Sequence, residues 1–203
     1  MLVYTLLVFA NVCGAIQVAF DWDHQSLHHT LLQTAARASN ALFLALVVVT
    51  TLTRLRPVQK AAGIEPRVSA LFGSFMLMTL FVLPRAQLSP VGLAISSTLI
   101  IIGTSASFVV LRWLGKSFSI MAEARRLITN GPYALVRHPL YICEEIAVIG
   151  LFIQVISPAA LLIVLAHALV QFRRMLNEEK VLNATFAEYS SYAARTPRLI
   201  PFG

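Results

Sequence analysis

Six runs of apolar residues, separated by short polar segments, dominate the sequence. They cover about residues 2–20, 38–53, 69–83, 91–111, 140–156 and 159–172. Apolar runs close to the ~20 residues that a helix needs to cross a bilayer predict membrane spans. Several runs are shorter than that, so a re-entrant or merged pair is an alternative. Ser157-Pro158 separates the last two runs and predicts a tight helical hairpin, because proline suits the first turn of a helix.

Composition supports a membrane protein. The chain has 203 residues, of which 58% are hydrophobic and 12% are charged, and its mean hydropathy is +0.76. A soluble domain carries roughly 25% charged residues. We therefore expect an all-α fold, a polytopic transmembrane helical bundle of about six spans. The net charge of +7 could suggest nucleic acid, but the apolar bulk argues against it, and we expect membrane lipids, no nucleic acid and no protein partner.

The basic residues are distributed unevenly between the two sides of the predicted bundle. If both termini are cytoplasmic, all but two of the 16 lysines and arginines fall in the inner segments, and the exceptions are Arg37 and Arg85. This asymmetry follows the positive-inside rule. It predicts an integral protein of the cell or inner membrane in a bacterium, or of the endoplasmic reticulum in a eukaryote. The long inner segments, 112–139 and the tail after Arg173, predict that function lies on the cytoplasmic face.

The segment before the fifth run carries the first candidate chemistry. Gly131-Pro132 indicates a turn, and His138 is biased towards extended geometry because a proline follows it. Pro139 fits the first turn of a helix, which places Arg137, His138 and Tyr141 around a helix N-terminus at the interface. Such a terminus favours an anion, for example the carboxylate of an amino-acid-like cofactor. The alternative is a simple interfacial anchor that holds lipid headgroups.

The tail repeats its charges and apolar residues with a helical period. Arg174, Glu178, Leu182 and Phe186 are spaced four apart, with Tyr189 three further, so on a helix they share one face. Glu178 therefore faces inward, one turn from Arg174, and the alternative is a structural ion pair that docks an amphipathic helix. Glu179 is rotated off this face, where a solvated side chain is the alternative to a role in the site.

Three ordered blocks resemble the isoprenylcysteine carboxyl methyltransferase family and its relatives, which include phospholipid N-methyltransferases. The lead-in is Leu114-Gly-Lys-Ser-Phe-Ser119, and the signature is Gly131-Pro-Tyr-x-x-x-Arg-His-Pro-x-Tyr141. The third block runs from Asn177-Glu-Glu through Phe186, Tyr189 and Tyr192 to Arg198-Leu-Ile-Pro201. The chain departs from the family pattern at Cys143, where a small residue is common, and at Ala187, where glycine often follows the phenylalanine.

The resemblance implies an integral membrane methyltransferase that uses S-adenosyl-L-methionine. It divides the chain into N-terminal transmembrane helices, 1–113, as scaffold and substrate side, and a cofactor-binding region, 114–203. It implies catalytic roles for Arg174, which would handle the substrate, and for Glu178. The implied cofactor-binding residues are Arg126, Leu127, Ile128, Tyr133, His138, Pro139, Leu140, Tyr141 and Glu178.

The methyl acceptor is open at this stage. A lipid-like or prenylated substrate is expected, with carboxyl, amine and thiol acceptors all possible. A carboxylate acceptor needs no base, whereas an amine would need one, for which Glu145 or Glu179 comes into question. Glu144 and the polar residues Gln154, His167 and Gln171 could line a substrate path or form hydrogen bonds between helices.

Other functions remain as alternatives. One is an NADPH-dependent membrane reductase of related helical architecture, and another is a non-catalytic membrane protein that keeps the fold. The segment with Asp21, Asp23, His24, His28 and His29 has spacing that suits a metal. We expect no metal there, because no second histidine cluster completes a site.

Overall fold

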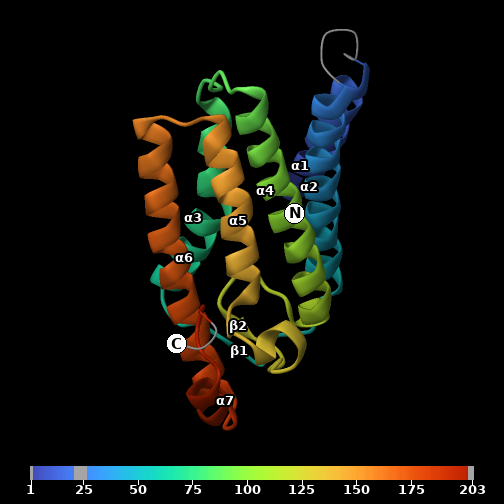
Figure 1. Cartoon of the computed structure of the whole chain (residues 1–203). Helices are drawn as coiled ribbons and strands as arrows, with labels where there is room; N and C mark the ends of the chain where they lie inside the picture. Colours follow the sequence, from blue (N-terminus) through green and yellow to red (C-terminus); the bar gives the residue numbers. More distant parts are fainter. Residues whose placement is uncertain (1, 21–26, 201–203) are drawn as a thin grey trace.

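The computed structural model describes residues 2–20 and 27–200, and it is built almost entirely of helices (Figure 1). The elements in chain order are α1 (Leu2–Phe20), α2 (Leu27–Thr53), β1 (Gln59–Lys60), α3 (Glu65–Phe75), the 3₁₀ helix η2 (Met76–Val82), α4 (Pro90–Leu114), η3 (Gly115–Ser117), β2 (Glu123–Ala124), η4 (Gly131–Ala134), α5 (Pro139–Gln154), α6 (Pro158–Thr185) and α7 (Tyr189–Arg195).

Each of the six apolar runs is helical, so the all-α class is confirmed. Within the described residues, three helices are long and apolar enough to cross a membrane: Thr30–Thr53, Pro90–Ser117 and Pro158–Thr185. Large apolar side chains on their outer faces, such as Leu162 and Leu169 of α6, are 69% and 72% exposed. An exposed apolar helix face of this kind is typical of a surface that contacts lipid. The protein is therefore an integral membrane protein, and the count of six spans stays a prediction.

The helix boundaries differ from the predicted runs in three places. The second helix begins at Leu27 rather than near residue 38, because its first turns are polar but still helical. The third run is split into α3 and η2, so it is not one regular span. The sixth run does not end near residue 172, because α6 continues unbroken to Thr185. The predicted hairpin helix and the amphipathic tail are thus a single helix.

Small residues set the spacing between α4 and α5, which lie side by side in Figure 1. A Cβ atom at Gly103 would lie 2.4 Å from the backbone nitrogen of Ala147, and one at Gly150 would lie 2.8 Å from the carbonyl oxygen of Ser96. The Ser96 hydroxyl donates a hydrogen bond of 2.9 Å to the carbonyl of Gly150. Close contact through small residues is typical of helices packed within membranes.

One end of the bundle carries β1, β2 and α7, and we call it the sheet end; the hairpin end carries the turn at Ser157 and residues 83–89 (Figure 1). The backbone N–H of Val58 donates to the carbonyl of Ala124, at 2.8 Å, and joins the segment after α2 to the one after α4. The N–H groups of Arg137 and His138 donate to the carbonyls of Pro197 and Arg198. The expected inner segments are thereby gathered at the sheet end.

Candidate functional site

A cavity of about 300 Å³ lies between the helices and the segment 117–141 of the sheet end. This volume is within the range of ~300–1,000 Å³ that is usual for ligand sites. Of the ten site residues predicted from the sequence, all but Pro139 line it: Arg126, Leu127, Ile128, Tyr133, His138, Leu140, Tyr141, Arg174 and Glu178. Pro139 is instead a buried residue of the first turn of α5.

The segment before α5 has the predicted turn and helix start, but not the extended conformation expected at His138. Gly131 has a φ of +60°, as the turn requires, and η4 follows it. His138 occupies the N-cap position of α5 with φ −127° and ψ 57°, and Pro139 is the first residue of the helix, which confirms the predicted helix start. Tyr133 is buried, and burial raises the pKa of its hydroxyl above the ordinary value. The backbone carbonyl of Tyr133 accepts a hydrogen bond of 2.6 Å from the hydroxyl of Tyr192, which ties α7 to this segment.

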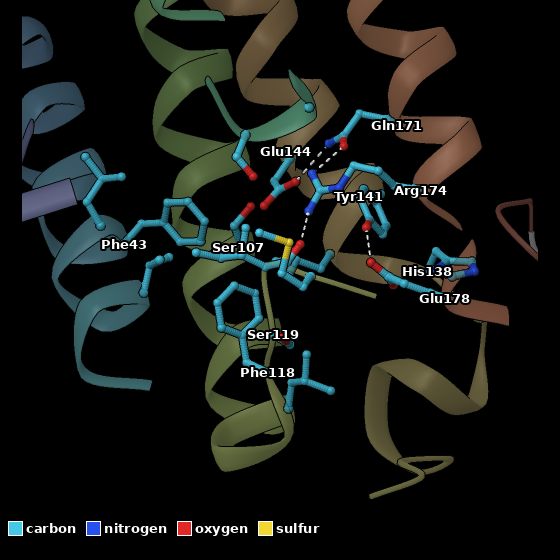
Figure 2. A pocket seen from close by; sticks show the side chains of 18 of the residues that line it. Phe43, Ser107, Phe118, Ser119, His138, Tyr141, Glu144, Gln171, Arg174 and Glu178 are labelled. Atoms are coloured by element: carbon cyan, nitrogen blue, oxygen red, sulfur yellow. Dashed lines mark hydrogen bonds between the residues drawn. The ribbon is translucent and has the colours of Figure 1, made fainter. Parts of the chain in front are cut away.

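Glu178 faces inward, as its helical phase predicts. Its carboxylate lines the cavity and accepts a hydrogen bond from the Tyr141 hydroxyl, so α5 and α6 are joined across the site (Figure 2). The predicted stripe is nevertheless too long. Phe186 is the residue that ends α6, in an extended conformation, and Tyr189 belongs to α7. Phe186 packs instead against Ala122, Ala124 and Val181.

Arg174 lies inside the cavity, and its side chain packs against Gly73 of α3. A Cβ atom at Gly73 would lie 2.6 Å from Cδ of Arg174, so the arginine needs glycine at this position of α3. Its guanidinium donates to Oε1 of Gln171 at 2.7 Å and to the carbonyl of Ile120 at 3.2 Å, and it stacks 5.4 Å from the centre of the Tyr141 ring. The expected direct pair with Glu178 is not among the ion pairs of the described residues, although the two charges attract each other.

The two glutamates of α5 take different places, which the sequence did not separate. Glu144 lines the cavity beside Arg174, and it accepts a hydrogen bond of 3.2 Å from the amide of Gln171 (Figure 2). Glu145 lies outside the cavity lining, with an oxygen 3.2 Å from Nδ1 of His167. His167 is buried, and its Nε2 lies 3.2 Å from the carbonyl of Gly73. Through these contacts, Glu145 and His167 fix the position of Gly73, against which the Arg174 side chain packs.

Glu179 is not a solvated side chain, so that alternative is wrong. Its side chain is only 11% exposed. Arg198 donates to both of its oxygens, at 2.9 and 2.7 Å, while Arg137 and His138 approach to 3.2 and 3.0 Å. The hydrogen bond to Glu179 also raises the pKa of Arg198. We call these four residues the Glu179 cluster; it fastens the C-terminal segment beneath the cavity.

The residues of the cavity suit the parts of S-adenosylmethionine. Arg125 and Arg174 line it, and each has a buried Nε–H group without a hydrogen-bond partner among the described residues. Buried donors of this kind suit a carboxylate. Glu178 suits an ammonium or ribose hydroxyl groups, and apolar side chains such as Phe118 and Leu182 suit a purine ring.

The expectation that segment 21–29 holds no metal stays a prediction. Asp21, Asp23 and His24 fall outside the described residues, as do the side chains of His28 and His29. Pro201, which closes the third sequence block, is likewise outside them.

A sequence profile of the phospholipid methyltransferase family matches residues 90–189, from the start of α4 to the start of α7. Over this stretch, which is just under half of the chain, the protein is similar to that family. The match contains all ten of the predicted site residues and confirms the resemblance drawn from the three sequence blocks. The methyltransferase region thus includes α4, for which the sequence blocks carried no signal, and it supports assignment of the chain as a membrane methyltransferase relative.

Three curated relatives are similar over parts of their length. The nickel-cobalt-cadmium resistance protein NccN of Alcaligenes xylosoxydans xylosoxydans is 38% identical over 81 residues, 39% of this chain and 38% of that protein. The cobalt-zinc-cadmium resistance protein CzcN of Cupriavidus metallidurans is 35% identical over 105 residues, 51% of this chain and 48% of that protein. The protein-S-isoprenylcysteine O-methyltransferase B of Arabidopsis thaliana is 31% identical over 115 residues, 52% of this chain and 57% of that protein. The matches therefore span about half or less of the first two relatives.

Proposed function

We propose that this protein is an integral membrane methyltransferase that uses S-adenosylmethionine to methylate a lipid-like acceptor. The observation that carries the proposal is the joining of Tyr141 and Glu178 beside Arg174 in one cavity, within the phospholipid methyltransferase region. These residues come from two helices and were singled out by the sequence motifs alone.

The cofactor end of the cavity is the part formed by residues 125–141 and Glu178. When bound there, S-adenosylmethionine supplies an activated methyl group on a sulfonium centre. Arg125 and Arg126 would hold its carboxylate, and Glu178 would accept hydrogen bonds from its ammonium or ribose. The Tyr141 hydroxyl orients the Glu178 carboxylate, and the Glu179 cluster holds the segment around His138 in place.

The acceptor end of the cavity extends between the N-terminal helices. It is lined by apolar side chains of three elements, α1, α2 and η2: Leu7, Phe43, Leu44, Met78 and Phe81. Such a surface suits an acyl or prenyl chain. This supports the division of the chain into a substrate side, 1–113, and a cofactor side, 114–203, and it favours a lipid-like or prenylated acceptor.

The residues next to Arg174 bear on the acceptor's nucleophile. For a carboxylate acceptor, Arg174 would orient the reacting oxygen and no base is needed. For an amine acceptor, Glu144 is the residue placed to take the proton, because it lines the cavity beside Arg174. We therefore propose Glu144 for the base role considered for Glu145 and Glu179. Glu145 lies against His167, and Glu179 is held by two arginines and His138.

We further propose six spans with the sheet end at the cytoplasm and both termini on that side. The basic residues of segments 54–67, 112–137 and 173–198 support this orientation. The cofactor would then enter from the cytoplasm and the acceptor from the bilayer.

The test is transfer of a labelled methyl group from S-adenosylmethionine into native membrane extract by the purified protein, followed by identification of the labelled molecule. We expect labelled lipid with the wild type, loss of turnover with unchanged cofactor affinity in Arg174→Gln, and weakened cofactor binding in Glu178→Ala. Glu188→Gln is the matched control, because Glu188 is exposed and outside the cavity lining. No labelled product with the wild type, or equal losses of cofactor affinity in both variants, would contradict this assignment.

A role in metal resistance is a second candidate, favoured by the names of NccN and CzcN. It is compatible with methyl transfer if the modified lipid alters the membrane. Expression in a cobalt- and cadmium-sensitive bacterium tests it. Growth protection by the wild type but not by Glu178→Ala would join the two functions; equal protection by both would separate resistance from methyl transfer.

A further inference from the structure

A second cavity, of about 290 Å³, lies at the hairpin end of the bundle. It shares Asn11, Asn40, Phe81 and Leu151 with the first cavity, so the two adjoin end to end. The amide of Asn40 donates a hydrogen bond of 3.0 Å to Oδ1 of Asn11, which places a polar link between α1 and α2 at this boundary. The second cavity is therefore a compartment that adjoins the first on the side away from the sheet end.

The charged residues of this compartment are both positive. Among its described lining residues, Arg37 of α2 and Arg85 of the segment after η2 carry charge, and none carries a carboxylate. The two guanidinium charges repel each other. They are also the two basic residues that depart from the positive-inside pattern of the sequence. Neither topology nor methyl transfer explains why two like charges face one compartment.

Both arginines contact neighbouring elements of the fold. The guanidinium of Arg37 packs against Gly14 of α1, where a Cβ atom would lie 1.9 Å from Nη1. Arg85 donates to Oε1 of Gln154 at 3.0 Å, while the N–H of Ala86 donates to the carbonyl of the same glutamine at 2.9 Å. Among the described residues, neither arginine forms an ion pair.

We propose that this second cavity is a binding site for the phosphate group of a phosphate ester. Two guanidinium groups match a phosphate in charge and in geometry, because each can donate two parallel hydrogen bonds. The side chains of Gln33 and Asn40 line the same cavity and can add amide donors. An arginine within the span Thr30–Thr53 is costly in lipid unless it faces a cavity or a partner, and a bound phosphate supplies that partner. The ligand is the headgroup of a phospholipid in the adjacent leaflet or a small soluble phosphate.

Binding by the purified full-length protein in detergent separates these sources. The probes are dihexanoyl phosphatidylglycerol, dihexanoylglycerol as the matched neutral lipid, and inorganic phosphate at constant ionic strength. We expect saturable binding of a phosphate-bearing probe and none of the neutral lipid. Saturation by the lipid alone assigns the site to a headgroup, and saturation by inorganic phosphate assigns it to a soluble ligand.

The variants test the residues. Arg37→Gln and Arg85→Gln should each weaken binding about tenfold or more, the usual effect of losing a charge-assisted hydrogen bond. Arg56→Gln removes the same charge from an exposed position at the sheet end and should leave binding unchanged. Arg85 is exposed, so its variant keeps the test valid if Arg37→Gln folds poorly.

Three results would overturn the proposal: binding of neither phosphate probe, equal affinity in both arginine variants and the wild type, or equally strong binding of dihexanoylglycerol. S-adenosylhomocysteine affinity, measured in the same samples, should be unchanged in both variants. The phosphate site and the methyltransferase function can therefore fail independently.

Discussion

Removal of the Glu179 carboxylate should destabilise the protein and loosen a cavity that Glu179 does not line. In the structure this carboxylate faces Arg137, His138 and Arg198. Glu179→Ala leaves the two arginine charges together without a counter-charge and removes the hydrogen-bond partner of His138. It also releases the link between α6 and the C-terminal segment, whose backbone pairs with the residues just before α5.

The size of the effect follows from the burial of the partners. Glu179 and Arg137 are 11% and 15% exposed in their side chains, whereas Arg198 is 33% exposed. Breaking a fully buried pair costs about 3–5 kcal/mol and an exposed pair at most about 1 kcal/mol. The Glu179 cluster lies between these limits, so we expect a loss of about 2–3 kcal/mol. For a chain of this size that is a drop of about 5–10 °C in Tm.

Thermal unfolding in detergent and titration with S-adenosylhomocysteine measure both consequences. We expect Glu179→Ala to lower Tm and cofactor affinity together, and Glu188→Gln, at an exposed position of the same region, to change neither. In a double-mutant cycle, Arg198→Ala should add little to Glu179→Ala, because both break the same cluster. An unchanged Tm, or fully additive effects of the two substitutions, would refute the reasoning.

Three further predictions follow from the cavity. Tyr141→Phe removes the hydroxyl that orients Glu178 and should weaken S-adenosylhomocysteine binding about tenfold, measured by calorimetry, with Tyr4→Phe as a control on the acceptor side. Gly73→Ala places a Cβ atom 2.6 Å from Cδ of Arg174 and should lower kcat several-fold while sparing cofactor affinity. A normal kcat would contradict the claim that Gly73 positions Arg174. Glu144→Gln should abolish methylation of an amine acceptor but leave methyl ester formation intact, so the identified product decides whether Glu144 acts as a base.

The helical class and the membrane location could be predicted from the sequence, because a lipid bilayer requires long apolar helices and an asymmetric distribution of basic residues. Long apolar runs and the asymmetry of basic residues predict a helical membrane protein from composition alone. Helix ends were less predictable. The polar start of α2 and the charged end of α6 are helical although neither is apolar, since packing at the bundle ends supports them. The run that contains the break between α3 and η2 has no proline, and its local signal is the pair Gly73-Ser74 just before the break.

The site was predictable where the chain has local patterns and not where it depends on tertiary contacts. Helical phase placed Glu178 correctly, and the Arg-His-Pro run placed His138 at the start of α5. The same phase could not show that Glu179 meets Arg137 and Arg198, because these partners lie far away in the sequence. Glu144 and Glu145 are adjacent in the sequence, and only the position of α6 decides which one faces the cavity.

The central claim is that the cavity at the sheet end binds S-adenosylmethionine. Calorimetric titration of the purified protein with S-adenosylhomocysteine, with NADPH in parallel, tests it most directly. We expect saturable binding of S-adenosylhomocysteine that Glu178→Ala weakens and Glu188→Gln does not, and no binding of NADPH. Binding of NADPH at a site that depends on Glu178, or no binding of S-adenosylhomocysteine by a folded wild type, would contradict the account.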